Sequence, residues 1–166
     1  MKMLLGLLAA GAIAIPTSLS ATETINLTVA SSHPTVVPWV GMIKTHFMAR
    51  TDEILAETGN YKIEWNEAFG GQLYKANATL TSVEEGITDI GWVFSFLEAA
   101  KLPLSQASSY APFSTANPPV QLEVMQELFE TNDAFRNEWE QHNLKVLGFT
   151  GTDGDDIYTK EPIDGI

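Results

Sequence analysis

The fold is decided by residues 67–93, EAFGGQLYKANATLTSVEEGITDIGWV, in which a turn, a helix and a strand follow one another. Gly70 and Gly71 predict the turn, because glycine adopts positive φ without a steric penalty. Gly86 is placed to end the helix in a left-handed conformation, and the apolar run 89–94 predicts a strand covered on both faces. One apolar helix face is predicted by four residues at helical spacing: Leu73, Ala76, Leu80 and Val83.

This turn is predicted to open the helix at Gly71 and Gln72, at the carboxyl end of a strand. Open α/β sheets bind ligands at that edge. The first N–H groups of a helix are unpaired and suit an anionic group on a small molecule. A tight strand–helix turn without a ligand is the alternative, and a glycine pair alone is a weak signal for a site.

The composition limits the classes of protein to be considered. The chain has 166 residues, a formal net charge of −12 and no cysteine. The length allows one domain. An acidic chain without a basic patch repels nucleic acid, so we expect no nucleic-acid partner. Without cysteine no disulfide can form, and packing must provide the stability.

Residues 1–20 have the features of a signal peptide. Lys2 is followed by an apolar run over residues 3–16, which is too short to cross a membrane. Ser18 and Ser20 are small residues suited to cleavage before Ala21. We therefore expect export to a periplasm, with a mature protein that is not embedded in the membrane.

The mature chain is predicted to continue as alternating strands and helices. Strands are expected over 25–31, 61–66, 89–94, 144–150 and 157–159, and helices from about 36 to 58, over 96–104, after Pro118–Pro119 and after Asn132. In the first helix Thr35 is the expected N-cap. Its expected buried stripe is Trp39, Ile43, Phe47 and Ile54. In the last helix Phe135 and Trp139 are expected to face inward, and Glu138 outward.

With these elements in place, the sequence resembles the substrate-binding proteins of tripartite ATP-independent periplasmic (TRAP) transporters, the DctP-like family. The motifs FGGQL (69–73) and EEGITDIGW (84–92) carry the resemblance, and the order of elements extends it from Ile25 to Ile163. The resemblance implies an α/β fold of the periplasmic-binding-protein type II, an open sheet with helices on both faces. It also implies a subunit without enzymatic activity that delivers a small organic acid, such as a dicarboxylate, to TRAP membrane permease subunits.

The family's chains are longer than this one and continue into a second lobe, in which an arginine binds the ligand's carboxylate. By this resemblance we expect an N-terminal fragment, with most of lobe one in residues 21–150 and the hinge crossing and the start of lobe two in residues 151–166. Such a fragment should bind ligand weakly or not at all and should expose apolar surface. Some members carry another arginine where this chain has residues 153–156, DGDD. A ligand with one carboxylate, or with a cationic part, is therefore favoured over one with several carboxylates.

The candidate ligand-binding residues follow the predicted strands or precede the first helix. They are Ser32, His33, Trp39, Glu67, Gly71, Gln72, Trp92 and Phe94. Each has an ordinary structural alternative: the Ser31–His33 loop as a polar turn, Trp39 as core, and Glu67 and Gln72 as solvated side chains. Of the three aromatic residues 92, 94 and 96, one is expected in the cleft and two in the core.

We expect no metal and no cofactor. The acidic residues 153–156 do not match a calcium-binding EF-hand loop, because its glutamate and glycine positions are not met. The three histidines are far apart in the sequence, and no nucleophile elbow, zinc-binding helix motif or phosphate-binding loop is present. Besides a TRAP subunit, the alternatives are a binding protein of an ATP-driven importer, the sensor lobe of a receptor, and an exported α/β enzyme.

Overall fold

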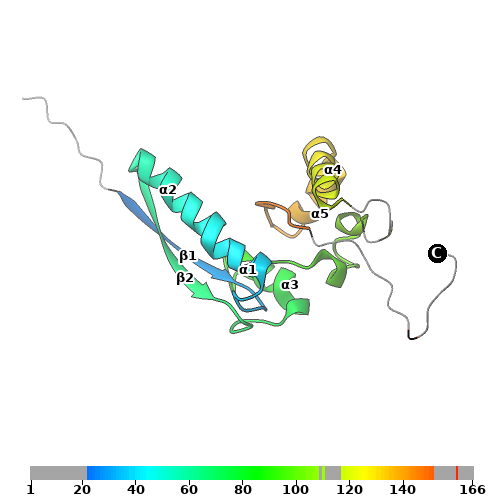
Figure 1. Ribbon diagram of the computed structural model, residues 1–166, viewed down its shortest axis with the longest axis horizontal. Coiled ribbons are helices and arrows are strands. Elements are labelled where there is room, and N and C mark those ends of the chain that lie inside the picture. Colours follow the sequence, from blue (N-terminus) through cyan, green and yellow to red (C-terminus); the bar gives the residue numbers. More distant parts are fainter. Residues whose placement is uncertain (1–21, 109, 111–116, 152–159, 161–166) are drawn as a thin grey trace, which may run out of the picture.

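The computed structural model describes residues 22–108, 110, 117–151 and 160 (Figure 1). The expected signal peptide, the short strand 157–159 and nearly all of the expected hinge and second-lobe segment lie outside these residues. The strands are β1 (Glu23–Ala30), β2 (Tyr61–Ala68) and β3 (Ile90–Gly91). The α-helices are α1 (Pro38–Met42), α2 (Ala49–Thr58), α3 (Thr79–Glu84), α4 (Pro118–Thr131) and α5 (Asp133–Glu140). Shorter helical turns are η1 (Ile43–Met48), η2 (Ala76–Ala78), η3 (Ser95–Leu97) and η4 (Leu104–Gln106).

The three strands form one parallel sheet in the order β2-β1-β3. β1 pairs with β2 along its whole length, from Glu23 opposite Tyr61 to Ala30 opposite Ala68. It pairs with β3 only at its carboxyl end, where Ala30 lies opposite Gly91. The α/β class and both predicted crossovers are confirmed. The second strand, β2, lies on one side of β1, and the third strand, β3, lies on the other side. The direction in which strands are added to the sheet therefore reverses between β1 and β3.

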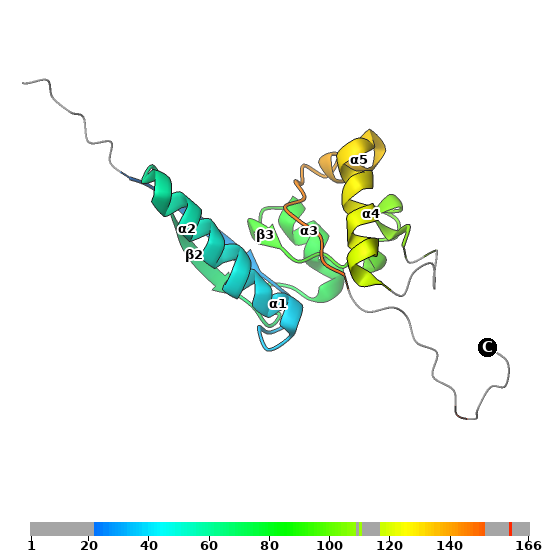
Figure 2. The same ribbon diagram turned by 45° about the horizontal axis from the view of Figure 1, so that its top comes forward.

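Helices cover both faces of this sheet (Figure 2). On one face the Trp65 indole of β2 donates to the Asp52 carboxylate of α2 at 3.0 Å. On the other face Tyr74 donates its hydroxyl hydrogen to the carbonyl oxygen of Ala30 at 2.7 Å, and burial raises the pKa of this tyrosine. A Cβ atom at Gly91 would lie 2.6 Å from Val83 Cγ2 of α3, so glycine permits this close helix–strand contact.

The first helical segment differs from the predicted helix in both its start and its buried face. Its N-cap is Val37 rather than Thr35, because Pro38, which lacks an N–H, takes the first helical position. η1 is a π-helical turn, which contains one more residue than an α-helical turn and rotates the residues that follow it. Val40 and Met48 are therefore the buried residues, whereas Phe47 and Ile54 are 36% and 47% exposed.

The predicted turn at Gly70 and Gly71 is confirmed, with φ angles of 77° and 74°. The predicted helix start at this turn is wrong. The chain stays non-helical after the glycines and enters a helical conformation at Ala76. As a result Leu73, predicted on the apolar face of the helix, is exposed, and Thr79, outside that predicted face, is buried.

Beyond β3 the chain forms less regular structure than the sequence predicts. The strand ends at Gly91, and the expected helix 96–104 is replaced by the two 3₁₀ turns η3 and η4. Pro103 and its preceding residue interrupt any continuous helix there. The expected strand 144–150 is also wrong, because these residues pair with no strand in the part of the chain that the structure describes.

The last two helices agree with the sequence pattern except at one residue. Pro118 begins α4, and the Asn132 side chain caps α5 by accepting a hydrogen bond from the amide of Ala134 at 3.0 Å. Phe135 is buried as predicted. Glu138, predicted to face solvent, is only 5% exposed. Its burial is explained by partners from a loop more than thirty residues earlier in the chain.

Candidate functional site

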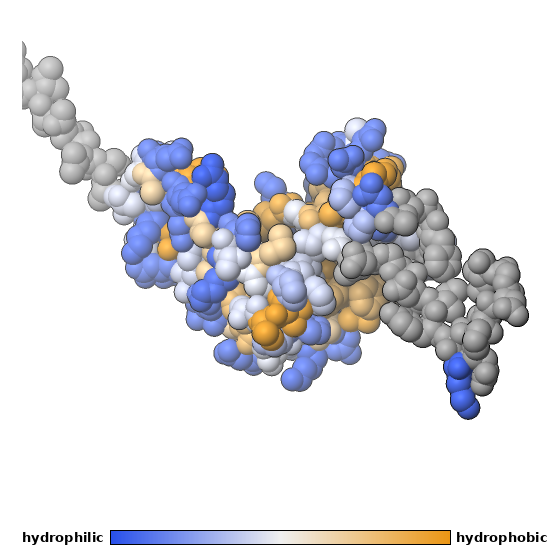
Figure 3. Space-filling view, in the orientation of Figure 1, coloured by the Kyte–Doolittle hydropathy of each residue, from blue (hydrophilic) through white to orange (hydrophobic). Residues whose placement is uncertain are grey.

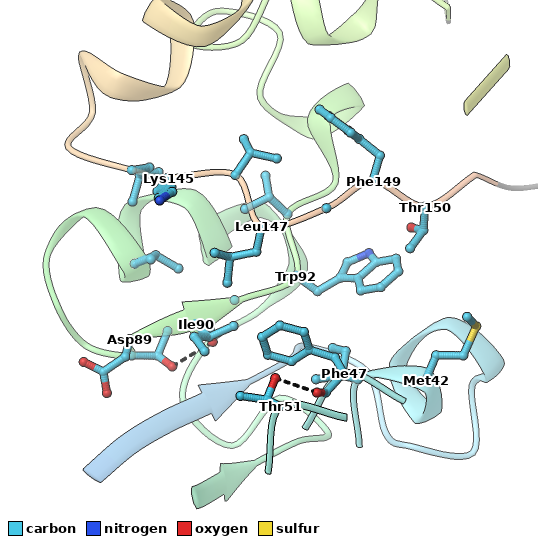
Figure 4. Close-up of a pocket in the computed structure, with 18 of the residues that line it drawn as sticks. Met42, Phe47, Thr51, Asp89, Ile90, Trp92, Lys145, Leu147, Phe149 and Thr150 are labelled. Carbon is cyan, nitrogen blue, oxygen red and sulfur yellow. Dashed lines mark hydrogen bonds between the residues drawn. The ribbon is translucent and has the colours of Figure 1, made fainter. Parts of the chain in front are cut away.

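A groove with a volume of about 1120 Å³ lies between three segments of the chain. One wall is formed by α1, η1 and α2, the second by residues 88–95, and the third by residues 143–150 (Figure 4). In Figure 3 the surface is hollowed between α2 and α4, with hydrophobic residues in the hollow. The volume suits a small organic ligand. The main apolar lining residues are Trp39, Ile43, Phe47, Ile54, Ile90, Trp92, Leu147 and Phe149.

The first wall is the apolar stripe predicted for the first helical segment. Trp39, Ile43, Phe47 and Ile54 all line the groove, and only Val40 and Met48 of this segment are buried. Phe47 makes an edge-on ring contact with Trp65, with ring centroids 6.2 Å apart. The hydroxyl of Thr51 donates to the carbonyl oxygen of Phe47 at 2.8 Å and is satisfied within the helix (Figure 4). The wall thus presents apolar side chains and few free polar groups.

The second wall is fixed to β1 by backbone and side-chain hydrogen bonds. The Asp89 carboxylate accepts from the amide of Thr28 at 2.7 Å. The Thr88 hydroxyl lies 3.0 Å from the carbonyl oxygen of Thr28 and 3.1 Å from that of Ile90. These contacts hold the short strand β3 in register, so that Ile90 and Trp92 are directed at the groove (Figure 4).

The third wall is held mainly by side chains at its two ends. At its start His142 Nδ1 lies 2.9 Å from a Glu84 carboxylate oxygen, and Lys101 Nζ lies 3.0 Å from the other. The hydrogen bond with His142, followed by that with Lys101, lowers the pKa of Glu84. At the other end Phe149 packs edge-on against Phe129 of α4, with ring centroids 5.3 Å apart.

The buried carboxylate of Glu138 connects α5 to the floor of the groove. It accepts hydrogen bonds from the amide of Leu104, from the amide of Ser105 at 2.9 Å and from the Ser105 hydroxyl at 2.6 Å. The Trp139 indole donates to the same hydroxyl at 2.8 Å. Ser105 and Trp139 both line the groove, so this network sets the position of part of its lining. The outward position predicted for Glu138 was wrong because its partners are distant in sequence.

The polar groups of the lining divide into paired and unpaired ones. Paired within the protein are the side chains of Thr45, Arg50, Thr51, Thr88, Asp89, Ser105 and Trp139. The Trp39 indole N–H is buried and has no partner among the described residues. The Trp92 indole N–H and the Lys145 ammonium group likewise have no hydrogen-bond or ion-pair partner there. These three groups only donate, whereas the lining side chains of Ser95, Asn143 and Thr150, which also form no hydrogen bond to a described residue, can both donate and accept.

The predicted anion site at the glycine turn is not available. The amide of Gly70 donates to the carbonyl oxygen of His33 at 3.0 Å, and the amide of Gly71 donates to that of Ser31 at 2.9 Å. These N–H groups bind the loop after β1 rather than facing an open cleft. A Cβ at Gly71 would lie 3.2 Å from the carbonyl oxygen of Ser32, so the glycine serves close packing of two loops.

Two further predicted residues have surface positions. Glu67 forms an ion pair with Lys44 at 2.7 Å, with the Lys44 side chain 53% and the Glu67 side chain 33% exposed. Gln72 is exposed and makes no hydrogen bond to any residue that the structure describes. Neither side chain lines the groove.

Ser32, His33 and Phe94 form a separate cluster at the carboxyl ends of β1 and β3. The Ser32 hydroxyl lies 2.9 Å from His33 Nδ1. The His33 ring packs edge-on against Phe94, with centroids 5.3 Å apart. A serine–histidine pair is the beginning of a nucleophile–base arrangement, which also requires a group that orients the histidine. Within the described ranges no carboxylate contacts His33.

Of the predicted site residues, the structure therefore brings only Trp39 and Trp92 to the groove. Phe94 lies with His33, and Phe96 is exposed. Sequence reasoning missed Phe47, Leu147 and Lys145 as lining residues. The apolar residues Phe47 and Leu147 were predicted to lie in a helix face and a strand of the core, and no sequence signal indicated that the segment 144–150 would stay unpaired and leave these side chains and Lys145 open to a groove.

Neither a metal site nor a membrane span is found in the described part of the chain. No group of three or more histidine, aspartate or glutamate side chains is arranged there to hold a metal ion. The acidic residues 153–156 lie outside the described residues. Within the described ranges no helix is long and apolar enough to cross a membrane. No model of a known protein family matches the chain, and no curated protein matches it.

Proposed function

We propose that the chain is the periplasmic solute-binding subunit of a TRAP-type transporter, built on a periplasmic-binding-protein fold of type II. In this role it captures a small organic acid and passes it to membrane permease subunits driven by an ion gradient. The motif resemblance at residues 69–73 and 84–92 supports the family. The parallel β2-β1-β3 order, with helices on both faces, is the arrangement this assignment requires at the start of the fold.

The observation that carries the proposal is the groove of about 1120 Å³ along β3. It begins next to the place where strand order reverses, between β1 and β3, which is where open α/β sheets bind ligands. Its walls are mostly apolar and contain a few unpaired donors, the usual composition of a small-molecule site. A protein that only binds and releases a solute needs a surface of this kind, and it does not need a nucleophilic side chain as an enzyme would.

The construction of the walls also suits capture and release. The first two walls are bound directly to the sheet. The hydrogen bond from Trp65 to Asp52 holds the first wall, and the hydrogen bond from the amide of Thr28 to Asp89 holds the second. The third wall is held by side-chain contacts at Glu84 and Phe129. A wall attached in this way can shift relative to the sheet at small energetic cost, as hinge-type ligand closure requires.

A ligand panel monitored by thermal unfolding tests the proposal. We expect weak binding, with a dissociation constant of about 1 mM, so that 10 mM ligand stabilises the chain by about 1.4 kcal/mol. This corresponds to a rise in Tm of several degrees for at least one organic acid, and to no rise with sugars or amines at the same concentration. The absence of a shift with any acid would contradict a solute-binding role for this chain.

A second candidate is an exported α/β hydrolase, because of the 2.9 Å contact between Ser32 and His33. The test is ester hydrolysis by the chain and by the variant Ser32→Ala. Turnover that is lost in the variant would establish the hydrolase. We expect no turnover above the uncatalysed rate in either protein, because His33 contacts Phe94 rather than an orienting carboxylate in the described structure.

A further inference from the structure

The lining contains two cationic side chains, Arg50 and Lys145, and two carboxylates, Glu53 and Asp89, and of these four only Lys145 makes no hydrogen bond or ion pair within the described part of the chain. Two carboxylates in the lining have partners: Glu53 pairs with Arg50 at 2.8 Å, and Asp89 accepts from the amide of Thr28. Lys145 contributes a positive charge to the lining and has no ion-pair partner among the described residues. One unpaired ammonium group favours a ligand that carries one negative charge.

Three of the unpaired hydrogen-bonding groups in the lining also favour a ligand that accepts hydrogen bonds, and the remaining ones, on Ser95, Asn143 and Thr150, can pair with donors or acceptors. The indole N–H groups of Trp39 and Trp92 only donate, as does Lys145. Trp39 Nε1 is buried, so a ligand reaches it only after a side-chain movement, whereas Trp92 and Lys145 are donors on the groove lining itself. A ligand with acceptor oxygens complements such a lining, whereas an ammonium or guanidinium ligand would add donors to it.

The rest of the lining requires an apolar ligand body. Leu147 is 60% exposed and lies next to Trp92, across the groove from Phe47 (Figure 4). Methylene groups of a ligand that are buried against such side chains favour binding, because apolar surface is removed from water. Lys145 and Leu147 come from the same segment, two residues apart, so that one ligand can reach both.

We propose that the groove binds an amphipathic monocarboxylic acid, with its carboxylate at Lys145 Nζ and its apolar body against Leu147 and Trp92. This inference rests on the proposed solute-binding function and specifies its ligand class. It assigns the recognition of the acid to a lysine in the third wall, not to the amides of the glycine turn, which are occupied by Ser31 and His33.

Calorimetric titration of the chain with three probes tests this proposal. The probes are octanoate, its uncharged analogue octanamide, and the short dicarboxylate succinate. We expect octanoate to bind about tenfold more tightly than octanamide, because only octanoate can form a charge-assisted hydrogen bond with the ammonium group. Succinate should bind more weakly than octanoate, since it offers no apolar body and brings a second charge.

Two matched lysine variants locate the carboxylate. Lys145→Met should bring octanoate down to the affinity of octanamide and leave octanamide binding unchanged. Lys75→Met is the control, because Lys75 is exposed, has no partner among the described residues and lies outside the groove. This control variant should keep the preference for octanoate.

The alternative outcomes separate this inference from the proposed function. Equal binding of octanoate and octanamide, or loss of the preference in Lys75→Met instead of Lys145→Met, would overturn the role of Lys145. Tighter binding of succinate would overturn the amphipathic ligand class and leave an organic-acid-binding subunit in place. If no organic acid binds at all, both proposals fail.

Discussion

β1 and the segment 144–150 share a sequence pattern that is typical of a strand, but they have very different environments. Residues 25–31, INLTVAS, and residues 144–150, LKVLGFT, both alternate apolar and other residues in a way that predicts a strand. β1 pairs with strands on both sides, and Val29 and Ala30 are fully buried. In the second segment Leu147 is largely exposed, and the chain pairs with no described strand.

The difference shows that strand propensity and strand pairing are separate conditions. β3, the sheet's edge on that side, is only two residues long and offers few backbone groups for a further strand. The segment 144–150 is instead held by His142 and Phe149 at its ends. The space left between this segment and α2 is the groove.

Truncation of one leucine in the core beside the sheet and of one in the segment 144–150 should give the largest difference in stability. Leu80 of α3 is fully buried, so Leu80→Ala should lower the free energy of unfolding by about 3 kcal/mol, through lost apolar contact and a cavity. Leu147→Ala makes the same change in the groove wall and should cost less than about 0.5 kcal/mol. Urea unfolding measures both. Similar losses in the two variants would mean that residue 147 is in the core.

The Glu138 network should have the next largest effect. Glu138→Ala leaves the amides of Leu104 and Ser105 without their acceptor and should lower the free energy of unfolding by about 2 kcal/mol. Glu140→Ala is the control on the same helix, and because Glu140 is exposed its effect should stay within about 0.5 kcal/mol. An equal response of the two variants to urea would contradict the connection between α5 and η4.

The contact of Glu84 with His142 and Lys101, at the start of the third wall, should give the smallest effect. We expect it as a change in how the stability of the protein depends on pH. The folded-state pKa of Glu84 is lowered by His142 and Lys101, whereas the unfolded value is about 4.3. The stabilisation is therefore complete above the unfolded pKa and is lost as the pH falls through the folded value. Glu84→Gln should reduce the acid-dependent part of the urea midpoint between about pH 5 and pH 2.

Glu57→Gln is the control for this measurement, because Glu57 is exposed on α2 and forms no ion pair within the described chain. It should retain the full acid dependence. A wild-type slope in the Glu84 variant would show that the carboxylate does not hold the third wall.

Local signals in the sequence predicted much of the fold. The alternation in β1 and β2, the positive φ at Gly70 and Gly71 and the Asn132 cap all depend on residues near one another in the chain, and all are confirmed. The α/β class follows from the order of these elements.

The candidate site was harder to predict because it depends on distant partners. The amides of Gly70 and Gly71 donate to carbonyl groups almost forty residues earlier in the chain. The sequence of the turn alone therefore could not show that these amides are already hydrogen-bonded and not free for a ligand. Hydrophobic spacing placed Trp39, Ile43, Phe47 and Ile54 on one helix face, as the structure does, but it could not show that this face is open to a groove rather than covered by other elements. Trp92 was found because it follows the carboxyl end of β3, and Trp39 because it lies at the start of the helix that follows β1.

Hydrogen exchange at the backbone amides of residues 145–149, compared with those of Val29 and Ala30, tests the existence of the groove most directly. The amides of Val29 and Ala30 lie in the fully paired centre of the sheet and should exchange slowly, by global unfolding. The amides of 145–149 donate to no described residue and should exchange many orders of magnitude faster. Protection of 145–149 equal to that of Val29 would place this segment in the sheet as a fourth strand, and the groove would not exist.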